Sequence, residues 1–344
     1  MGSIGIGAHT SSEIPLLDMS WYTSGSELER RQFCASLLQS FSHQGMVKLI
    51  NHSIREDDIK SAFHWNKELF NLPEETKSQI KRPAQANPNR GWCPKGHEKS
   101  YAITDFEKGQ KKDKPEILDV KESFDMGALD DPLYDNKWLA EEKFPGFRPF
   151  MEKFYGECHN LHTTLLEAVE EGFRAEGHNV DLQTLCKENV SEMRLNYYPP
   201  IHVRELRSER VNRISEHTDF GTFTLLLQDS VGGLEVENQS DLGTYFPVEA
   251  SSMNEILVNV GDSLQRITND FFTSVSHRVV VPSSFANKDT GIIAGRYSIA
   301  YFAKVARAQS LKPLPMFVDP NETPKYEDMT AFEWNQIKLK KIYG

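Results

Sequence analysis

Hydrophobic and polar positions divide the chain into a helical part and a part rich in strands. Before residue 190, apolar residues recur every three or four positions within polar stretches, which is the spacing of one buried helix face. The clearest case runs from Gly146 to Glu176 and separates the two parts. Helices are predicted over residues 27–42, 55–70, 146–176 and, near the C-terminus, 332–342.

Three short runs in the first part predict strands, at residues 14–18, 45–52 and 122–127. The polar, lysine-rich stretch 82–119 lies between the second and third runs, and we expect most of it to be loop. Its densest basic segment, residues 108–114, contains no aromatic residue. This composition favours a solvated excursion over a binding patch.

After residue 190 the apolar pattern changes to a period of two, with β-branched residues bounded by Pro, Gly, Asn and Asp. The predicted strands are 192–198, 222–228, 234–237, 246–249, 256–260, 276–281 and 296–302. Short strands so evenly spaced are typical of a sandwich or barrel. The fold class expected is therefore α+β or mainly β, with helices flanking a β core.

Composition narrows the class of protein. The 344 residues contain 39 basic and 50 acidic side chains, a net charge of −11, so nucleic acid is not an expected partner. No run of eighteen apolar residues predicts a membrane span, and residues 1–13 do not resemble a secretion signal. Four scattered cysteines are expected to be free thiols, which suits a cytoplasmic protein.

The first chemical candidates are His217, Asp219 and His277. His217 and Asp219 are two positions apart in or near a strand, so they can share a face, and His277 lies in a later predicted strand. Each element alone has a simpler interpretation, an exposed polar pair or a hydrogen-bonded core histidine. Together, two histidines and one carboxylate make the facial triad that binds iron(II) and leaves positions open.

A second candidate lies in strand 296–302, where Arg296 and Ser298 share a face. A guanidinium fork and a nearby hydroxyl can clamp a carboxylate. Asn196 and Tyr198 form a similar polar row in strand 192–198. Buried polar rows of this kind need a ligand or hydrogen-bond partners.

The order Asn-x-Tyr-Pro, His-x-Asp, a distant His and Arg-x-Ser resembles that of the iron(II)- and 2-oxoglutarate-dependent dioxygenases, in particular the isopenicillin-N-synthase-like group. The resemblance extends to the N-terminal segments 14–18, 45–52 and 69–73. It departs after Tyr198, because many relatives have Asn-Tyr-Tyr-Pro-x-Cys, whereas Pro200, Ile201 and His202 stand here. That change bears on substrate or subfamily more than on the cofactor.

The resemblance implies a double-stranded β-helix, or jelly roll, that holds iron through His217, Asp219 and His277. It also implies that Arg296 and Ser298, assisted by Tyr198 and Asn196, bind 2-oxoglutarate. O2 would be the oxidant, with ascorbate as a supporting reductant. The domains implied are a dioxygenase N-terminal domain (14–135), a helical connection (136–189), the jelly-roll domain (190–305) and a C-terminal tail and helix (306–344).

The expected activity is hydroxylation, desaturation or oxidative rearrangement of a small organic molecule in secondary metabolism, with release of succinate and CO2. The chain would act as a monomer or weak homodimer, without nucleic acid or membrane. Residues considered for the substrate side are Phe302, Arg194, Phe124, Trp92, Arg90 and Tyr101. Core packing is an equally good interpretation of Phe302.

Two other functions stay open at this point. An isopenicillin-N-synthase-like oxidase would use Fe(II) and O2 without 2-oxoglutarate, and Arg296 and Ser298 would then grip the substrate itself. A binding protein could keep the jelly roll without chemistry. Production of succinate in step with O2 consumption separates the expected dioxygenase activity from both.

Overall fold

The computed structural model describes residues 13–85, 87–98, 118–208 and 211–343. Its largest sheet contains β1 (Leu16–Asp18), β2 (Met46–Ile50), β3 (Gly91–Cys93), β5 (Glu122–Gly127), β6 (Glu192–Tyr198), β10 (Phe223–Gln228), β13 (Ile256–Val260) and β16 (Arg296–Phe302). A smaller sheet contains β9 (Ile214–His217), β11 (Leu234–Glu237), β12 (Tyr245–Pro247) and β14 (His277–Val279). Two short pairs join β4 (Leu118–Asp119) to β8 (Val211–Asn212), and β7 (Ile201–His202) to β15 (Ile292–Ile293).

The helices are α1 (Ser20–Thr23), α2 (Glu27–His43), α3 (Glu56–Asn71), α4 (Glu74–Ser78), α6 (Phe147–Ala175), α7 (Leu182–Leu185), α8 (Val203–Leu206), α9 (Asp262–Ile267) and α10 (Ala331–Tyr343). Short 3-10 turns lie at Ser283–Phe285 and Pro315–Phe317. None of the helices in the described ranges is both long and apolar enough to cross a membrane.

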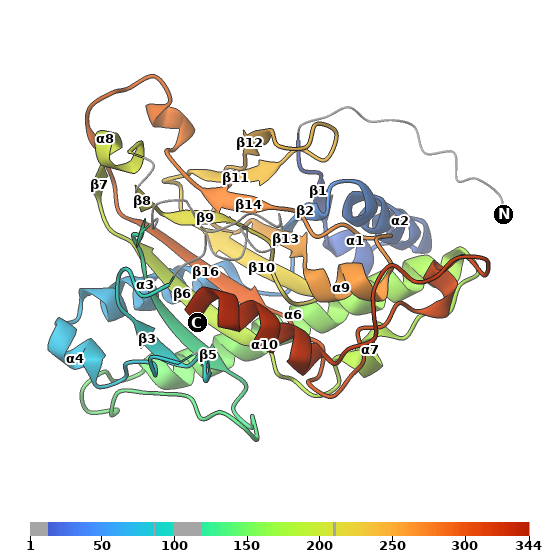
Figure 1. The fold of residues 1–344 in the computed structure, drawn as a ribbon, viewed down its shortest axis with the longest axis horizontal. Coiled ribbons are helices and arrows are strands. Elements are labelled where there is room, and N and C mark those ends of the chain that lie inside the picture. Colours follow the sequence, from blue (N-terminus) through green and yellow to red (C-terminus); the bar gives the residue numbers. More distant parts are fainter. Residues whose placement is uncertain (1–12, 86, 99–117, 209–210, 344) are drawn as a thin grey trace.

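The two sheets face each other as the layers of a jelly roll. The large sheet has the order β1-β2-β13-β10-β16-β6-β5-β3, and the small one the order β12-β11-β14-β9 (Figure 1). One apolar cluster takes side chains from both layers, with Met46 and Leu257 from the large sheet and Leu234 and Val279 from the small one. The expected jelly-roll core is therefore confirmed, and strands from the N-terminal segments extend its large sheet on both sides.

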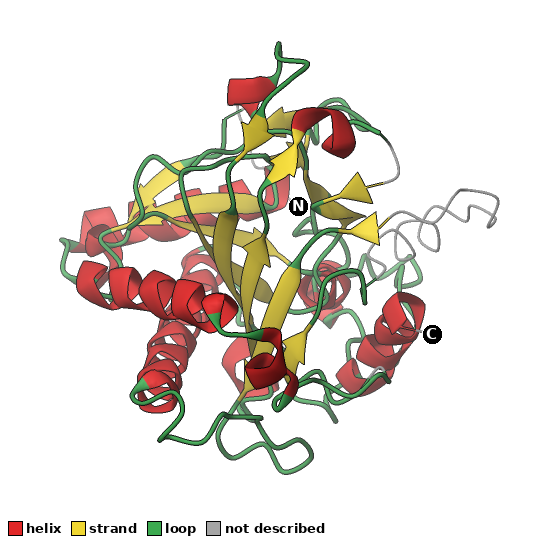
Figure 2. Ribbon diagram, turned by 90° about the vertical axis from the view of Figure 1, so that its left-hand side faces the viewer, coloured by secondary structure: helices red, strands yellow, loops and turns green. Residues whose placement is uncertain are grey.

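Helices cover the other face of the large sheet (Figure 2). On β6, Met193 and Leu195 point to this face and are fully buried with side chains of α2, α3 and α6 in the main core. The alternate residues of the strand, Arg194 and Asn196, point between the sheets and line a cavity. The period of two thus sends apolar residues to the helices and polar residues to the interior of the jelly roll.

Most predicted elements occur where the pattern places them. The bounds of β6, β11, β13 and β16 agree to the residue, and α6 is one residue shorter at each end than its predicted range. The prediction that 82–119 is mostly loop missed β3, which pairs with β5. The expected basic excursion at 108–114 lies outside the described residues. All four cysteines are free and buried, as expected.

The last helix, α10, packs against the loop and helix that follow β13. Lys338 is 1% exposed, and its Nζ lies 2.8 Å from Oδ2 of Asp262 on α9. Because Lys338 is fixed there, the neighbouring Asn335 and Leu339 reach the cavity between the sheets. The C-terminal helix therefore supplies part of the cavity wall.

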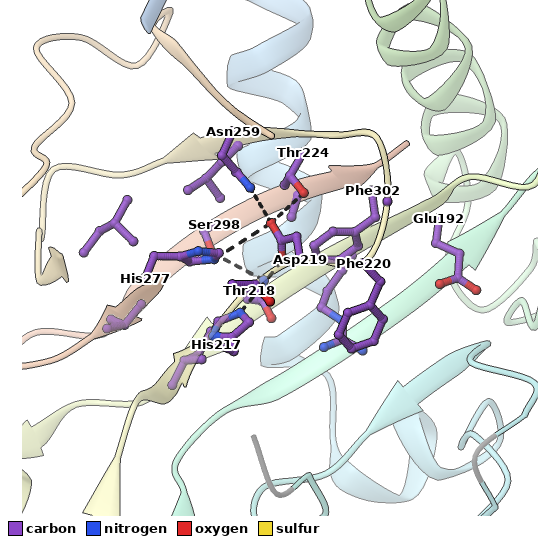
Figure 3. Close-up of a pocket in the computed structure, with 18 of the residues that line it drawn as sticks. Glu192, His217, Thr218, Asp219, Phe220, Thr224, Asn259, His277, Ser298 and Phe302 are labelled. Atoms are coloured by element: carbon purple, nitrogen blue, oxygen red, sulfur yellow. Dashed lines mark hydrogen bonds and ion pairs between the residues drawn. The ribbon is translucent and has the colours of Figure 1, made fainter. Parts of the chain in front are cut away.

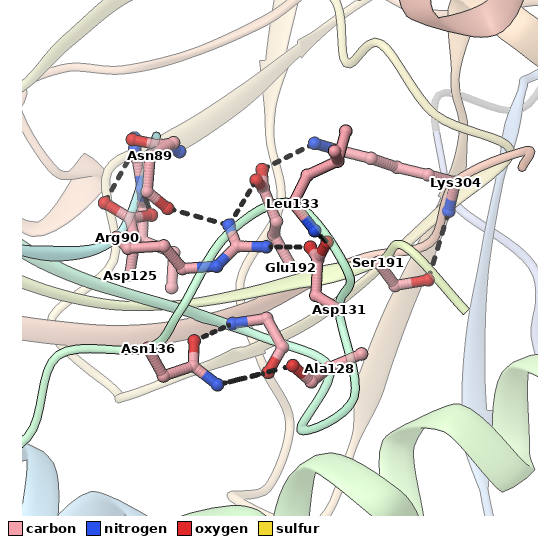
Figure 4. A network of polar contacts seen from close by, with 12 residues as sticks. Asn89, Arg90, Asp125, Ala128, Asp131, Leu133, Asn136, Ser191, Glu192 and Lys304 are labelled. Carbon is pink, nitrogen blue, oxygen red and sulfur yellow. Dashed lines mark hydrogen bonds and ion pairs between the residues drawn. The ribbon is translucent and has the colours of Figure 1, made fainter. Parts of the chain in front are cut away.

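A buried ion-pair network joins β6 to the segment after β5 (Figure 4). Arg90 is fully buried and donates to Asp131 (2.9 Å) and Glu192 (2.6 Å), while Lys304 also pairs with Glu192. An added Cβ on Gly127 would lie 2.0 Å from Nη2 of Arg90, so only glycine leaves room for the guanidinium. Arg90, considered above for the substrate side, is held in the interior by these carboxylates and does not line the cavity between the sheets.

Replacing Arg90 by Met should lower the free energy of unfolding by about 3–5 kcal/mol, because Asp131 and Glu192 would lose a buried counter-charge. Urea unfolding followed by circular dichroism measures the loss. Arg31→Ala is the matched control, since its ion pair with Glu27 is 67% and 79% exposed and should contribute less than about 1 kcal/mol. Equal effects of the two substitutions would contradict a structural role for the network.

Candidate active site

A cavity of about 140 Å³ lies between the two sheets. Its floor is the inner row of β6 and β16, paired as Arg296 with Tyr198 and Ser298 with Asn196. All four line the cavity, as the sequence predicted. His217 and His277 line it from the small sheet, and apolar side chains complete its walls: Met46, Leu226, Leu234, Leu257 and Val279.

His217, Asp219 and His277 come together at the centre of this cavity (Figure 3). The two histidines are directly paired across β9 and β14, with ring centroids 4.3 Å apart. The Nε2 atom of His217 lies 3.9 Å from Oδ1 of Asp219, and that of His277 lies 3.8 Å from Oδ2. One ligand atom from each residue lies within 4.8 Å of the others, so a single metal ion could contact all three.

The spacing of His217 and Asp219 allowed both to lie in one strand. The structure places Asp219 beyond that strand, in the turn between β9 and β10. Its position is fixed by two residues of the large sheet that the sequence analysis missed. Thr224 Oγ1 donates to Oδ2 of Asp219 at 2.6 Å, and Asn259 Nδ2 donates to the same oxygen at 2.8 Å. The period of two explains why both side chains point inward from β10 and β13. Their contact with Asp219 could not be predicted, because it depends on which strands are neighbours in the sheet.

Backbone carbonyl groups determine which nitrogen of each imidazole carries a proton. Nδ1 of His217 lies 2.9 Å from the carbonyl of Ser215, and Nδ1 of His277 lies 3.2 Å from that of Val275. A carbonyl can only accept, so each Nδ1 carries the proton and each Nε2 offers a lone pair toward Asp219. Burial, and next the neighbouring His277, lower the pKa of His217 to about 4, so this ring is neutral at neutral pH.

The carboxylate of Asp219 is ionised despite its burial. Burial acts to raise its pKa, but His277, His217 and the hydrogen bonds from Thr224 and Asn259 together hold the pKa below its usual value. Two imidazoles and one carboxylate are the donors that suit iron(II) with open positions. The donor set therefore fits the iron expected from the sequence.

Arg296 provides a second test of fit. It is 1% exposed, and its Nη2 donates to Gln228 Oε1 at 2.9 Å. Its Nε and Nη1 atoms are buried without a hydrogen-bond partner. Ser298 lies beside it, within 3.4 Å of Asn196 Nδ2. A buried cation with two unused donors beside a hydroxyl suits a carboxylate ligand, which is what 2-oxoglutarate would supply.

Of the six residues considered for the substrate side, the structure places two in the cavity wall. Phe302 and Arg194 both line it, further along β16 and β6 from Arg296. Arg194 is held by Asp125 (2.6 Å) and by Glu98 (3.0 Å). Other charged residues in this outer part of the cavity escaped the sequence analysis because they stand in irregular segments: Glu98, Lys121 and Lys304.

Phe124 and Trp92 are not among the residues that line the cavity. Phe124 packs on Trp138 and Phe147 in the core beneath the helices, and Trp92 pairs with it across β3 and β5. Both faces of β3 and both faces of β5 are buried. Burial of a residue in these strands therefore does not show which face borders the cavity. Arg90 belongs to the ion-pair network described above, and Tyr101 lies outside the described residues.

Comparison with known families agrees with this geometry. The model of the 2OG-Fe(II) oxygenase superfamily matches residues 189–305. The model described as the non-haem dioxygenase in morphine synthesis N-terminal matches residues 14–145. Together they cover most of the chain.

Individual relatives and solved structures are similar over nearly the whole length. A 2-oxoglutarate-Fe(II) type oxidoreductase (ppzD) of Metarhizium rileyi is 45% identical, over 95% of this chain and 91% of its own. A proline hydroxylase (buaE) of Petromyces alliaceus is 43% identical, over 96% of this chain and all of its own. The crystal structure of a full-length Neurospora crassa protein in complex with alpha-KG and thymine has a TM-score of 0.81 and 30% identity, covering 95% of this chain and 96% of that chain.

The orientation of Asp219 predicts a measurable effect on metal affinity. His277→Ala should abolish stoichiometric Fe(II) binding, and Asn259→Leu should weaken it by about 10- to 100-fold because Asp219 loses an orienting hydrogen bond. Anaerobic calorimetry with Fe(II) measures both. Asn189→Leu, which removes an amide that bonds Tyr155 outside the cavity, is the control and should bind as the wild type. Unchanged affinity in Asn259→Leu would refute this role.

Proposed function

The chain belongs to the 2OG-Fe(II) oxygenase superfamily and is a 2-oxoglutarate-dependent dioxygenase; from this premise we propose that His217, Asp219 and His277 hold its iron. We further propose that Arg296 and Ser298 bind the distal carboxylate of 2-oxoglutarate, with Tyr198 and Asn196 beside them. The observation that carries this assignment is the buried Arg296, whose two unused donors share a cavity with the triad.

When bound, iron(II) and 2-oxoglutarate supply oxidation of a substrate C–H bond by O2, coupled to decarboxylation of 2-oxoglutarate to succinate and CO2. The chain's own residues orient the reactants. The inner row of β6 and β16 fixes one end of 2-oxoglutarate, and the carbonyls of Ser215 and Val275 keep Nε2 of each histidine directed at the metal. The apolar side chains of the small sheet exclude water from the reacting atoms.

The oxidase alternative, without 2-oxoglutarate, has less support. Relatives that are 41–45% identical to this chain are named 2-oxoglutarate-Fe(II) type or 2-oxoglutarate-dependent enzymes. Several similar solved structures contain alpha-KG. The domain bounds at 135, 189 and 305, the monomer or weak homodimer, the absence of nucleic acid and the cytoplasmic location stay predictions.

For the substrate, we propose a small amino acid or a carboxylate derived from one. The cavity wall includes Arg194 and Lys121, which both pair with Glu98, together with the apolar Phe302 and Leu339. This arrangement suits a molecule with a charged end and an apolar body. The proline hydroxylase that is 43% identical to this chain supports the same class.

The test is a substrate screen with purified protein, Fe(II), ascorbate and 2-oxoglutarate, in which succinate and O2 consumption are measured together. We expect proline or another small apolar amino acid to raise succinate formation in step with O2 consumption. Thymine, the ligand crystallised with the Neurospora protein, serves as the neutral comparison. Stimulation by thymine and by no amino acid would overturn the substrate class. Substrate oxidation without succinate would overturn the assignment of Arg296 to 2-oxoglutarate.

Arg194→Lys separates the substrate end of the cavity from the cofactor end. Lysine keeps the charge beside Asp125 but loses the bidentate fork, so KM for the substrate should rise about tenfold while the Kd of 2-oxoglutarate stays unchanged. Arg30 forms a bidentate pair with Glu171 away from the cavity, so Arg30→Lys is the matched control and should leave both constants unchanged. A rise in the 2-oxoglutarate Kd alone would place Arg194 at the other end of the site.

A further inference from the structure

A second arginine lies fully buried close to Arg296. Arg213 connects β8 to β9 and is 0% exposed, which is rare for an arginine. Its guanidinium carbon lies 5.9 Å from the ring centre of Tyr198, and that of Arg296 lies 5.0 Å from the same ring. Two buried guanidinium groups thus contact one tyrosine of the cavity wall.

The hydrogen bonds of Arg213 leave its charge uncompensated. Nη2 donates to the carbonyl of Ala294 at 2.7 Å, while Nε and Nη1 are buried without a partner, as are the same two atoms of Arg296. Within the described ranges, neither guanidinium forms an ion pair with a carboxylate. Asp229 is near enough to raise the pKa of Arg213, but its carboxylate accepts hydrogen bonds from the backbone N–H groups of Val231 and Tyr297.

Two buried guanidinium groups without a counter-charge are unfavourable unless an anion binds beside them. Burial, and next the nearby Arg296, lower the pKa of Arg213 to about 10, so the Arg213 side chain is still cationic at neutral pH. Two like charges in an interior of low dielectric repel each other and have lost their hydration. An anion bound at Arg296 would remove part of this cost for both of them.

We propose that Arg213 is a positioning residue for the distal carboxylate of 2-oxoglutarate. The proposal rests on the assignment of Arg296 and Ser298 above. Tyr198 and Arg296 line the cavity, and Arg213 does not, so Arg213 acts from behind them. Its cation holds the Tyr198 ring by a cation–π contact and adds a second positive charge to the end of the site that receives the carboxylate.

This role predicts a selective loss of affinity. Pyruvate has the same 2-oxo acid group as 2-oxoglutarate but no distal carboxylate, so it reports binding at the metal alone. In the Mn(II)-loaded protein, Arg213→Met and Arg213→Gln should raise the Kd of 2-oxoglutarate by about 10- to 100-fold and leave that of pyruvate within about twofold. Calorimetry under N2 measures both without turnover.

The two variants and one control keep the test decisive. Gln keeps a hydrogen-bond donor but not the charge, so Arg213→Gln carries the test if Arg213→Met does not fold. Arg266→Met is the control, because Arg266 is also buried and packs on Tyr326 and Trp334, away from Tyr198. It should be less stable than the wild type but bind both 2-oxo acids normally.

The results for the variants and for the wild type test different assignments, that of Arg213 and that of Arg296 with Ser298. Equal weakening of 2-oxoglutarate and pyruvate, or no weakening of either, in a folded Arg213 variant would overturn the role of Arg213 and leave Arg296 untouched. Failure of the folded, metal-loaded wild type to prefer 2-oxoglutarate over pyruvate would instead overturn the assignment of Arg296 and Ser298.

Discussion

The site depends on the antiparallel pairing of β6 with β16. Its register sets Arg296 beside Tyr198 and Ser298 beside Asn196, and the alternation of the strands turns all four toward the interior of the jelly roll. A slip of one residue would send this polar row into the apolar core beneath the helices. Apolar residues next to this row on the opposite strand face, such as Leu195 and Ile299, prevent that slip because they are buried in the core.

The metal site depends on both sheets at once. The small sheet pairs His217 with His277, whereas Thr224 and Asn259 of the large sheet orient Asp219 from the opposite side. The site therefore exists only when the two layers pack at the right distance. The same interior position lowers the pKa of His217 and leaves Arg213 and Arg296 without counter-charges, so the fold stores unfavourable electrostatics that ligands can relieve.

Strand periodicity predicted the inner row of β16 and β6 because their two faces differ sharply in polarity. Periodicity gives no such guide for Phe124, since β5 is buried on both faces and this side chain packs against helix α6 and not in the cavity wall. Arg90 and Arg213 could not be interpreted from sequence at all. Their surroundings come from distant segments, such as Glu192 and Tyr198, and a single charged residue carries no periodicity.

We propose that one cavity holds iron at the triad and places a 2-oxo acid between that iron and Arg296. Anaerobic addition of 2-oxoglutarate to the Fe(II)-loaded protein tests it most directly, because a chelated 2-oxo acid gives a weak visible charge-transfer band. We expect a band that saturates with 2-oxoglutarate. A folded protein that binds Fe(II) but shows no band at any 2-oxoglutarate concentration would contradict it.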